Sequence, residues 1–164
     1  MIRAFFTAAF LASCAPVSAQ PLDADIDLII VEKAKHQLSV YREGILLKRY
    51  TVALGWGGLD PKEQQGDGKV PEGRYLITAH NPNSAYYLSL RIGYPTATQR
   101  ADAAARGVNP GGDIMIHGLP NGRGGFGATH RTVDWTDGCI AVTDEEIEEL
   151  FEHVADGTPI VIQP

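Results

Sequence analysis

One histidine and one cysteine in the second half of the chain stand where they could do chemistry. His117 closes an apolar run at residues 114–116, so its imidazole is expected at the end of a buried strand. Cys139 follows 22 positions later, directly after Gly138 in the stretch DWTDGC. A thiol, an imidazole and backbone N–H groups beside a glycine are the parts that acyl transfer needs, namely a nucleophile, a general base and oxyanion donors.

The N-terminus suggests that this cysteine is exported. Residues 1–19 contain a basic start, an apolar run and a small-residue ending, which is typical of a secretory signal. The sequence LASC ending at Cys14 also resembles a lipobox, in which Cys14 would become the lipidated first residue. Either cleavage leaves Cys139 without a partner in its own chain. An unpaired thiol is a liability in an oxidising compartment unless it is buried or used, so export favours a functional Cys139.

Length and composition favour one strand-rich domain. The chain has 164 residues with 18 Gly and 10 Pro, which suits many turns and a single core. We expect residues 20–26 to form a short leader and residues 27–164 one domain, with no transmembrane helix after signal removal, because a bilayer span needs roughly 20 apolar residues. Removing residues 1–19 changes the formal net charge from −6 to −7, which argues against nucleic acid as a partner.

The elements that must position the pair are mostly strands. Hydrophobic patterning and turn residues predict strands at residues 28–31, 37–42, 45–54, 74–79, 86–92, 113–117 and 158–163. Residues 55–69 are rich in Gly, Asp, Lys and Gln and predict a mobile loop. A Gly-rich connection at residues 118–134 leads to the cysteine segment.

Two helices are also predicted. The first covers the alanine-rich residues 98–106 and ends at Gly107. The second begins after Thr143, where Glu146 completes a capping box, and has apolar residues at helical spacing before it ends at Gly157.

The motifs around the pair resemble a known family. Residues 116–118 read Ile-His-Gly and residues 136–140 read Thr-Asp-Gly-Cys-Ile. They resemble the motif of the L,D-transpeptidase catalytic (YkuD) family, in which His-Gly or His-Ser on a strand is followed by Ser/Thr-His-Gly-Cys. Residues 70–75, VPEGRY, are similar to the family's Thr-Pro-x-Gly-x-Tyr turn. The resemblance covers residues 27–163 and implies a mainly β fold with short helices, of a β-sandwich or barrel-like kind.

The resemblance implies a role for each matching residue. Cys139 would be the nucleophile and His117 its general base, with the Gly118 backbone carbonyl orienting the imidazole. The amides of Gly138 and Cys139 would be the oxyanion donors. We expect the imidazole to make the sulfur anionic, and the resemblance implies no cofactor and no metal.

Two positions depart from the family motif. Asp137 stands where the family usually has His, and Ala141 where Asn or Arg is frequent. His130 and Asp134 either take the place of the missing histidine, by binding substrate or supporting the thiolate, or form hydrogen bonds within their loop. Thr136 and Asp137 are further candidates for contact with substrate or for support of the site.

The resemblance also implies a substrate, the stem peptide of bacterial peptidoglycan. The thiolate would attack the carbonyl at the L-centre of the diamino acid and expel the terminal D-residue. The thioester would then pass to an amine, on another stem peptide or on a protein, or to water. The protein would act in the periplasm or cell envelope, and Arg91, Arg123 and Arg131 are candidates for binding acidic groups of the donor.

Other functions fit parts of the same pattern. A metal hydrolase could use His117, His130 and Cys139, but the chain lacks a compact ligand pair such as His-x-x-x-His. Papain-like and NlpC/P60-like peptidases place the cysteine before the histidine, the reverse of the order here. An L,D-carboxypeptidase on the same fold, or a non-catalytic wall-binding protein, remain alternatives. Trp56 and Trp135 either flank a groove or pack inside.

Overall fold

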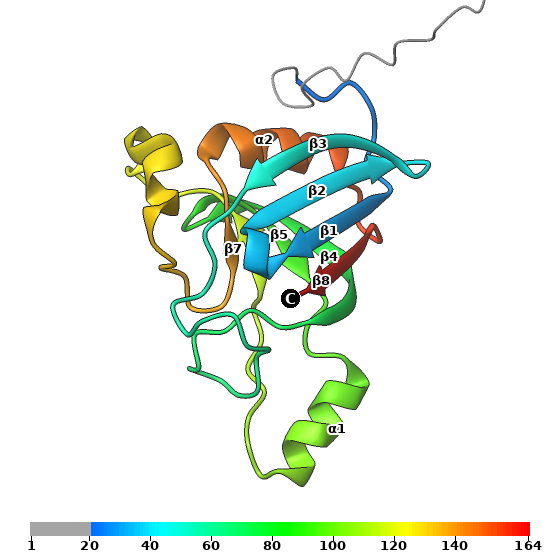
Figure 1. The fold of residues 1–164 in the computed structure, drawn as a ribbon, viewed down its shortest axis with the longest axis vertical. Coiled ribbons are helices and arrows are strands. Elements are labelled where there is room, and N and C mark those ends of the chain that lie inside the picture. Colours follow the sequence, from blue (N-terminus) through cyan, green and yellow to red (C-terminus); the bar gives the residue numbers. More distant parts are fainter. Residues whose placement is uncertain (1–20) are drawn as a thin grey trace, which may run out of the picture.

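A computed structural model describes residues 21–164, and the N-terminal signal and lipobox predictions, Cys14 included, lie outside these residues (Figure 1). Eight strands form one sheet in the order β3-β2-β1-β8-β4-β5-β6-β7. The strands are β1 (Leu28–Glu32), β2 (Gln37–Arg42), β3 (Ile45–Thr51), β4 (Gly73–Ser84), β5 (Tyr87–Ile92), β6 (Met115–His117), β7 (Ile140–Ala141) and β8 (Pro159–Gln163).

The sheet curls until its two edges meet. Strands β3 and β7 lie at opposite ends of the strand order, yet residues just after β3 bridge to β7 and its approach, Ala53 to Ala141 and Gly55 to Thr136. Ala53 and Ala141 exchange two backbone hydrogen bonds of 2.9 and 3.0 Å. This closure confirms the expected barrel-like, mainly β fold.

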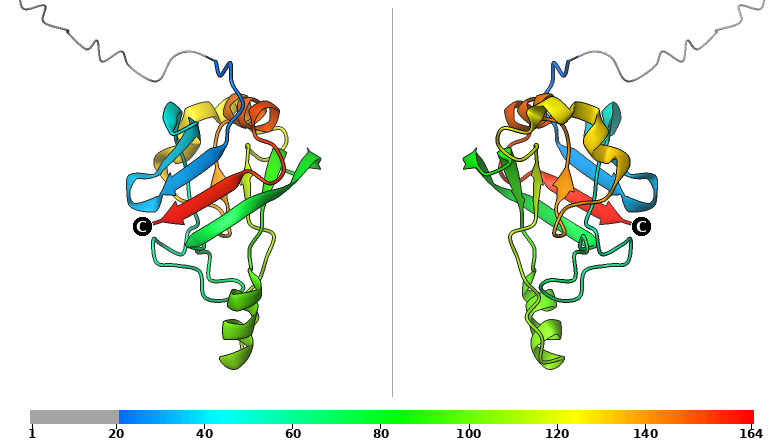
Figure 2. Two further views of the ribbon diagram at one scale, coloured as in Figure 1. Left: turned by 90° about the vertical axis from the view of Figure 1, so that its right-hand side faces the viewer. Right: turned by 90° about the vertical axis from the view of Figure 1, so that its left-hand side faces the viewer.

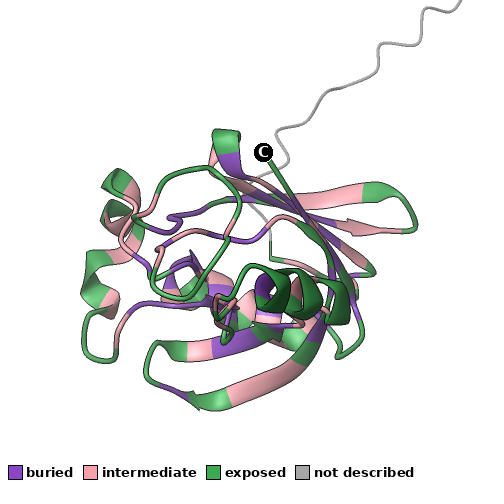
Figure 3. Ribbon diagram, turned by 90° about the horizontal axis from the view of Figure 1, so that it is seen from below, coloured by how far each residue is buried: buried purple, intermediate pink, exposed green. Residues whose placement is uncertain are grey.

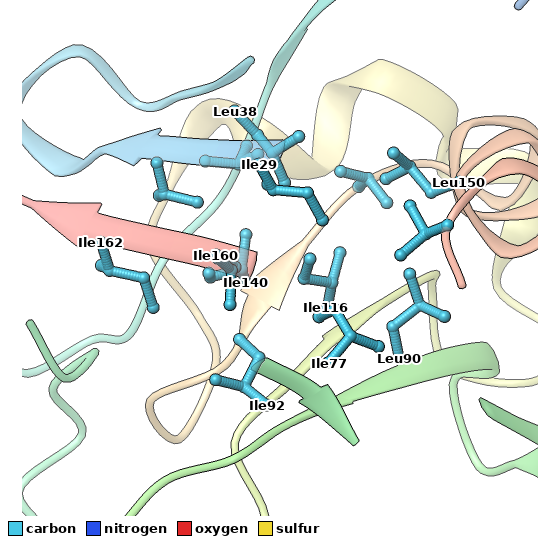
Figure 4. Close-up of a cluster of buried hydrophobic side chains, with 14 of the residues drawn as sticks. Ile29, Leu38, Ile77, Leu90, Ile92, Ile116, Ile140, Leu150, Ile160 and Ile162 are labelled. Atoms are coloured by element: carbon cyan, nitrogen blue, oxygen red, sulfur yellow. The ribbon is translucent and has the colours of Figure 1, made fainter. Parts of the chain in front are cut away.

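The interior of the curled sheet is aliphatic. Alternation along the strands points one face of each inward, and β-branched side chains suit this pleated surface. Figure 4 shows the central side chains meeting from both halves of the sheet, and Figure 3 shows that buried residues concentrate on the strands. The labelled members of this cluster are Ile29, Leu38, Ile77, Leu90, Ile92, Ile116, Ile140, Leu150, Ile160 and Ile162.

Two α-helices differ in how they meet this sheet. Helix α2 (Asp144–His153) begins with the predicted capping box at Thr143 and Glu146, and it buries Ile147 and Leu150 in the core. Helix α1 (Ala97–Ala105) projects away from the sheet (Figures 1 and 2) and buries only Ala103. Within residues 21–164, no helix combines the length and apolar character needed to cross a bilayer.

Several boundaries differ from the prediction. Strand β3 ends at Thr51, and β6 begins at Met115 because Asp113 has a φ of 56°, which breaks an extended backbone. A short 3₁₀-helix, η1 (Lys33–Lys35), connects β1 to β2. The Gly-rich connection contains the segment η2 (Gly124–Thr132), in which two 3₁₀ turns are separated by a kink at Gly127, where φ is 45° and ψ is −137°. The sequence analysis missed it because its glycines weaken any helical pattern.

Candidate active site

The pairing of β6 with β7 brings the backbone at His117 close to the segment that carries Cys139. The two strands are parallel, with Ile116 opposite Ile140 and His117 opposite Ala141. Cys139 directly precedes β7 and lies two residues before Ala141, the partner of His117 in this register. Strand spacing and rise place the Cα atoms of His117 and Cys139 roughly 8 Å apart. The strand pairing thus brings together two motifs that lie 22 residues apart in the sequence.

His117 is held in one tautomer. Its side chain is 3% exposed, and Nδ1 lies 2.7 Å from the carbonyl oxygen of Gly118. A carbonyl only accepts, so Nδ1 carries the hydrogen and Nε2 is left as the acceptor. Burial lowers the pKa of His117 to about 4, because the Gly118 carbonyl offsets this only in part and His130 adds to the lowering. The imidazole is therefore a neutral base at neutral pH.

Cys139 is partly buried at the edge of a pocket of about 670 Å³. Its Sγ lies 3.5 Å from the carbonyl oxygen of Asp113, to which the thiol donates. Burial raises the pKa of the Cys139 thiol, the Met115 backbone and Lys62 act against the rise, and the Asp137 carboxylate adds to it. The resting sulfur is therefore a neutral thiol, which differs from the expected thiolate.

The turn before Cys139 depends on glycine. Gly138 has a φ of 114°, and a methyl group there would lie 2.6 Å from the carbonyl oxygen of Lys69. Gly55 faces the carbonyl of Gly68 in the same way, with a methyl group 2.0 Å from its oxygen. Three backbone segments thus approach one another closely next to the residue before Cys139, and only glycine permits this approach.

Thr136 shapes the same turn. Its hydroxyl donates to the carbonyl oxygen of Cys139 at 2.8 Å and accepts from the amide of Gly138 at 3.3 Å. The backbone of Thr136 also bonds to Leu54 and Trp56. Thr136 therefore holds the backbone of the turn that carries Cys139. The Gly138 amide, a predicted oxyanion donor, is engaged inside the turn.

An aromatic cluster surrounds the histidine. The Tyr86 ring centroid lies 4.5 Å from that of His117, and the Trp135 centroid lies 5.7 Å from it. Trp135 donates its indole hydrogen to Nδ1 of His130 at 3.3 Å. Trp135 therefore contacts both His117 and His130. Burial lowers the pKa of His130 to about 4, Arg131 adds to this lowering, and Glu146 opposes it. The sequence analysis missed Tyr86, which only the strand pairing brings to the site.

Asp134 supports the site from outside the pocket. Its carboxylate lies 2.9 Å from Nε2 of His36 and accepts from the amide of Leu54 at 2.8 Å. It therefore ties the start of the cysteine segment to the chain that follows β3. The pocket beside Cys139 is lined instead by residues of the loop 55–69, the turn before β6 and the cysteine turn, among them Lys62, Gln65, Asn109, Asp113 and Asp137.

The loop at residues 55–69 forms one wall of this pocket and is tied down. Asp67 accepts from the amides of Glu63, Gln64 and Lys69 and from Nζ of Lys62 at 2.7 Å. The sequence predicts a mobile loop here, but these hydrogen bonds hold the loop in place. They join residues close together in the chain and follow no periodic pattern, so the sequence does not reveal them. Gln65 and Asn109 then join the loop to the turn before β6 through backbone and side-chain hydrogen bonds.

The arginine candidates have different environments. Arg91 pairs with Asp113, and Arg131 pairs with Glu146 at the start of α2. Arg123 lies over the Phe126 ring at 5.8 Å, beside a second, apolar pocket of about 300 Å³ that also contacts His130 and Trp135. None of the three lines the pocket that holds Cys139.

The comparisons with known proteins identify the class that this fold and site define. Residues 26–162 match the family described as the L,D-transpeptidase catalytic domain, YkuD. The chain therefore belongs to the YkuD family, as its motifs indicated.

Curated relatives come from Escherichia coli. The protein named "Putative L,D-transpeptidase YafK" of strain K12 is 35% identical over 122 residues, which is 73% of this chain and 41% of that protein. The protein of the same name from strain O157:H7 matches equally well. The chain thus spans about two fifths of the length of these relatives.

Solved structures share the fold. The helical cell shape determining protein Pgp2 from Campylobacter jejuni has a TM-score of 0.64 at 24% identity, over 86% of this chain and 48% of that one. Bd1075 from Bdellovibrio bacteriovorus has a TM-score of 0.60 at 24% identity, over 91% and 53%. An L,D-transpeptidase from Mycobacterium smegmatis has a TM-score of 0.57 at 16% identity, over 86% and 59%.

Proposed function

We propose that this protein is an exported cysteine acyltransferase that acts on peptidoglycan stem peptides through a thioester at Cys139. The observation that carries the proposal is the pairing of β6 with β7, which brings the segments of His117 and Cys139 together, with the imidazole tautomer fixed by Gly118 and the thiol lining a pocket. Family membership and the names of the relatives support the substrate class and a place in the cell envelope. The similarity to Pgp2 supports a contribution to cell shape.

The first half-reaction needs one proton transfer in each direction. The Cys139 thiol gives its proton to Nε2 of His117 as the sulfur attacks the carbonyl carbon of the donor peptide. The C–N bond then breaks, and the leaving amine of the terminal D-residue takes the proton from Nε2. A neutral thiol beside a neutral imidazole suits this sequence, because the base must be free to accept at the moment of attack.

The second half-reaction reverses these transfers. An acceptor amine attacks the thioester carbon and gives a proton to Nε2, and the C–S bond breaks. His117 returns the proton to sulfur, which restores the thiol. Water in place of the amine would give hydrolysis, the outcome of an L,D-carboxypeptidase, and a lysine of a protein would give attachment of that protein to the wall.

The negative oxygen formed in each half-reaction needs backbone donors. We assign the role of main oxyanion donor to the amide of Cys139. The amide of Gly138 is the second donor. The Gly138 amide must first leave the hydroxyl of Thr136, and the bond between them is long at 3.3 Å. One such donor is worth roughly 3–4 kcal/mol of transition-state stabilisation in other enzymes.

Purified muropeptides test this function directly. The protein is incubated with tetrapeptide and pentapeptide muropeptides, and the products and the intact protein are measured by mass spectrometry. We expect loss of the terminal D-residue, together with a cross-linked or hydrolysed product, and an acyl adduct on Cys139. The Cys139→Ala variant is the control.

The products also separate the alternatives. A cross-linked dimer identifies transpeptidation, and loss of the D-residue alone identifies hydrolysis. Unchanged muropeptides that bind equally well to the protein and to Cys139→Ala would identify a non-catalytic wall-binding protein and overturn the proposal.

A further inference from the structure

The pocket beside Cys139 contains three charged side chains, and two of them are neutralised within the protein. Lys62 is 3% exposed and lies 2.7 Å from Oδ1 of Asp67, and it also donates to the carbonyl oxygen of Gln64 at 3.0 Å. Asp113 forms an ion pair with Arg91. Each pair reduces the net charge that its members contribute to the pocket, although Lys62 still lowers the pKa of Cys139 somewhat. The third charged residue, Asp137, has a larger effect on that pKa, and it raises it.

Asp137 keeps an uncompensated charge. Its Oδ1 accepts a hydrogen bond from Nε1 of Trp56 at 2.9 Å, and the indole is a neutral donor. Within residues 21–164, no ion pair includes Asp137. A full negative charge therefore lies at the pocket, two residues before Cys139 in the chain.

The indole keeps this carboxylate in place. The Trp56 ring packs so closely over Gly68 that a methyl group at residue 68 would lie 2.5 Å from it. Gly68 and Asp137 both line the pocket. Trp56 is 57% exposed, but its ring lies against Gly68, and its hydrogen bond holds the exposed carboxylate of Asp137 beside the pocket.

We propose that Asp137 is a specificity-determining residue that selects acyl donors with an ammonium group beside the scissile carbonyl and disfavours donors with a carboxylate there. The inference rests on the proposed function in taking Cys139 as the reacting group. The matching group on a stem peptide is the side-chain amine of the diamino residue whose carbonyl is attacked.

The charge of Asp137 also links the choice of acyl donor to the reactivity of the Cys139 thiol. The carboxylate raises the pKa of the Cys139 thiol, so it opposes formation of the thiolate in the empty site. An ammonium bound between the two would cancel this effect and ease the loss of the thiol proton. A cationic donor would thereby promote its own acylation.

Charged thiol reagents test the field without any peptide substrate. Methanethiosulfonates with a trimethylammonium, a neutral methyl or a sulfonate group each react with a thiolate, forming a mixed disulfide and releasing methanesulfinate. Rates at Cys139 are divided by those with 2-mercaptoethanol. We expect the cationic reagent to exceed the anionic one by about threefold to tenfold at low salt, and the ratio to shrink as salt screens the charge.

Three variants define the result. Asp137→Asn should bring the ratio close to one, and Asp137→Glu should keep most of it. Asp102→Asn removes an exposed carboxylate on α1 and is the matched control for net charge, so its ratio should equal that of the unaltered protein. An unchanged ratio in a folded Asp137→Asn protein would overturn the proposal, and so would an anionic preference in the unaltered protein.

Peptide donors separate this proposal from the function itself. Stem peptides with a free or an N-acetylated side-chain amine are compared in the muropeptide assay. Turnover of both at the same rate would refute selection by charge while leaving the acyltransferase intact. Turnover of neither, with a normal reagent ratio, would refute the acyltransferase and leave the charge assignment standing.

Discussion

The Nδ1 hydrogen of His117 is donated to the carbonyl oxygen of the next residue, Gly118, at 2.7 Å. This contact replaces the carboxylate that orients the histidine in many catalytic triads. A neutral carbonyl fixes the ring without adding charge. Its hydrogen bond raises the pKa of His117 but offsets only part of the lowering by burial. In the proposed mechanism the pair therefore exchanges a proton during the reaction and does not rest as an ion pair.

Removal of either reacting group should reduce turnover strongly. Cys139→Ala should reduce turnover of muropeptides to the background rate, and His117→Gln should reduce it by about 10²–10⁴, the usual contribution of a positioned base. Cys139→Ala should keep its melting temperature, since the side chain it shortens is at a pocket edge. Full activity in Cys139→Ala would contradict the thioester mechanism.

The pH profile should show the lowered basicity of His117. With a pKa of about 4, the imidazole is neutral and able to accept a proton at any pH above that value. The acid limb of kcat/KM should therefore lie near pH 4, well below the value of an ordinary histidine. The rate of alkylation by neutral iodoacetamide should keep rising with pH up to and beyond pH 9, because the pKa of Cys139 is raised. An acid limb between pH 6 and 7 would argue against a buried neutral base.

Gly138→Ala should destabilise the protein and reduce thiol reactivity. The substitution combines a φ of 114° with a methyl group 2.6 Å from a backbone oxygen, which has no room to move. We expect a loss of more than about 2 kcal/mol in the free energy of unfolding, from urea denaturation. Gly122→Ala is the matched control. It also has a positive φ, 82°, but no atom lies within 4 Å, so about 1 kcal/mol is expected. Equal losses would show that the close approach to Lys69 does not matter.

Asp67→Asn should loosen the wall of the pocket in a pH-dependent way. Partial burial would raise the pKa of Asp67, but hydrogen bonds from Gln64, Lys62, Glu63 and Lys69 lower it to about 2. A lowered acid pKa stabilises the fold fully above the ordinary value near 4, and this stabilisation is lost as pH falls toward 2.

The measurement is the free energy of unfolding of both proteins from pH 7 to pH 2. The unaltered protein should exceed Asp67→Asn by about 1–3 kcal/mol at pH 6, as expected for charge-assisted hydrogen bonds, and by little at pH 2. A difference that stays constant across this range would mean that the charge of Asp67 contributes nothing.

The sequence alone determined the features that depend on neighbours in the chain. Thr143 and Glu146 form the predicted capping box because its hydrogen bonds join residues three apart. Gly107 follows α1 with a φ of 69°, as a left-handed stop requires. The motifs around His117 and Cys139 also indicated the family and the mainly β fold.

Only the tertiary structure decided which distant groups meet at the site. Closure of the sheet brings the segment after β3 against the cysteine turn, and the pairing of β5 with β6 brings Tyr86 to His117. The protonation of the thiol and the charge of the pocket depend on burial and on contacts between residues as far apart as Trp56 and Asp137. No local pattern encodes such terms, because desolvation and Coulomb energies depend on distances in space and not along the chain.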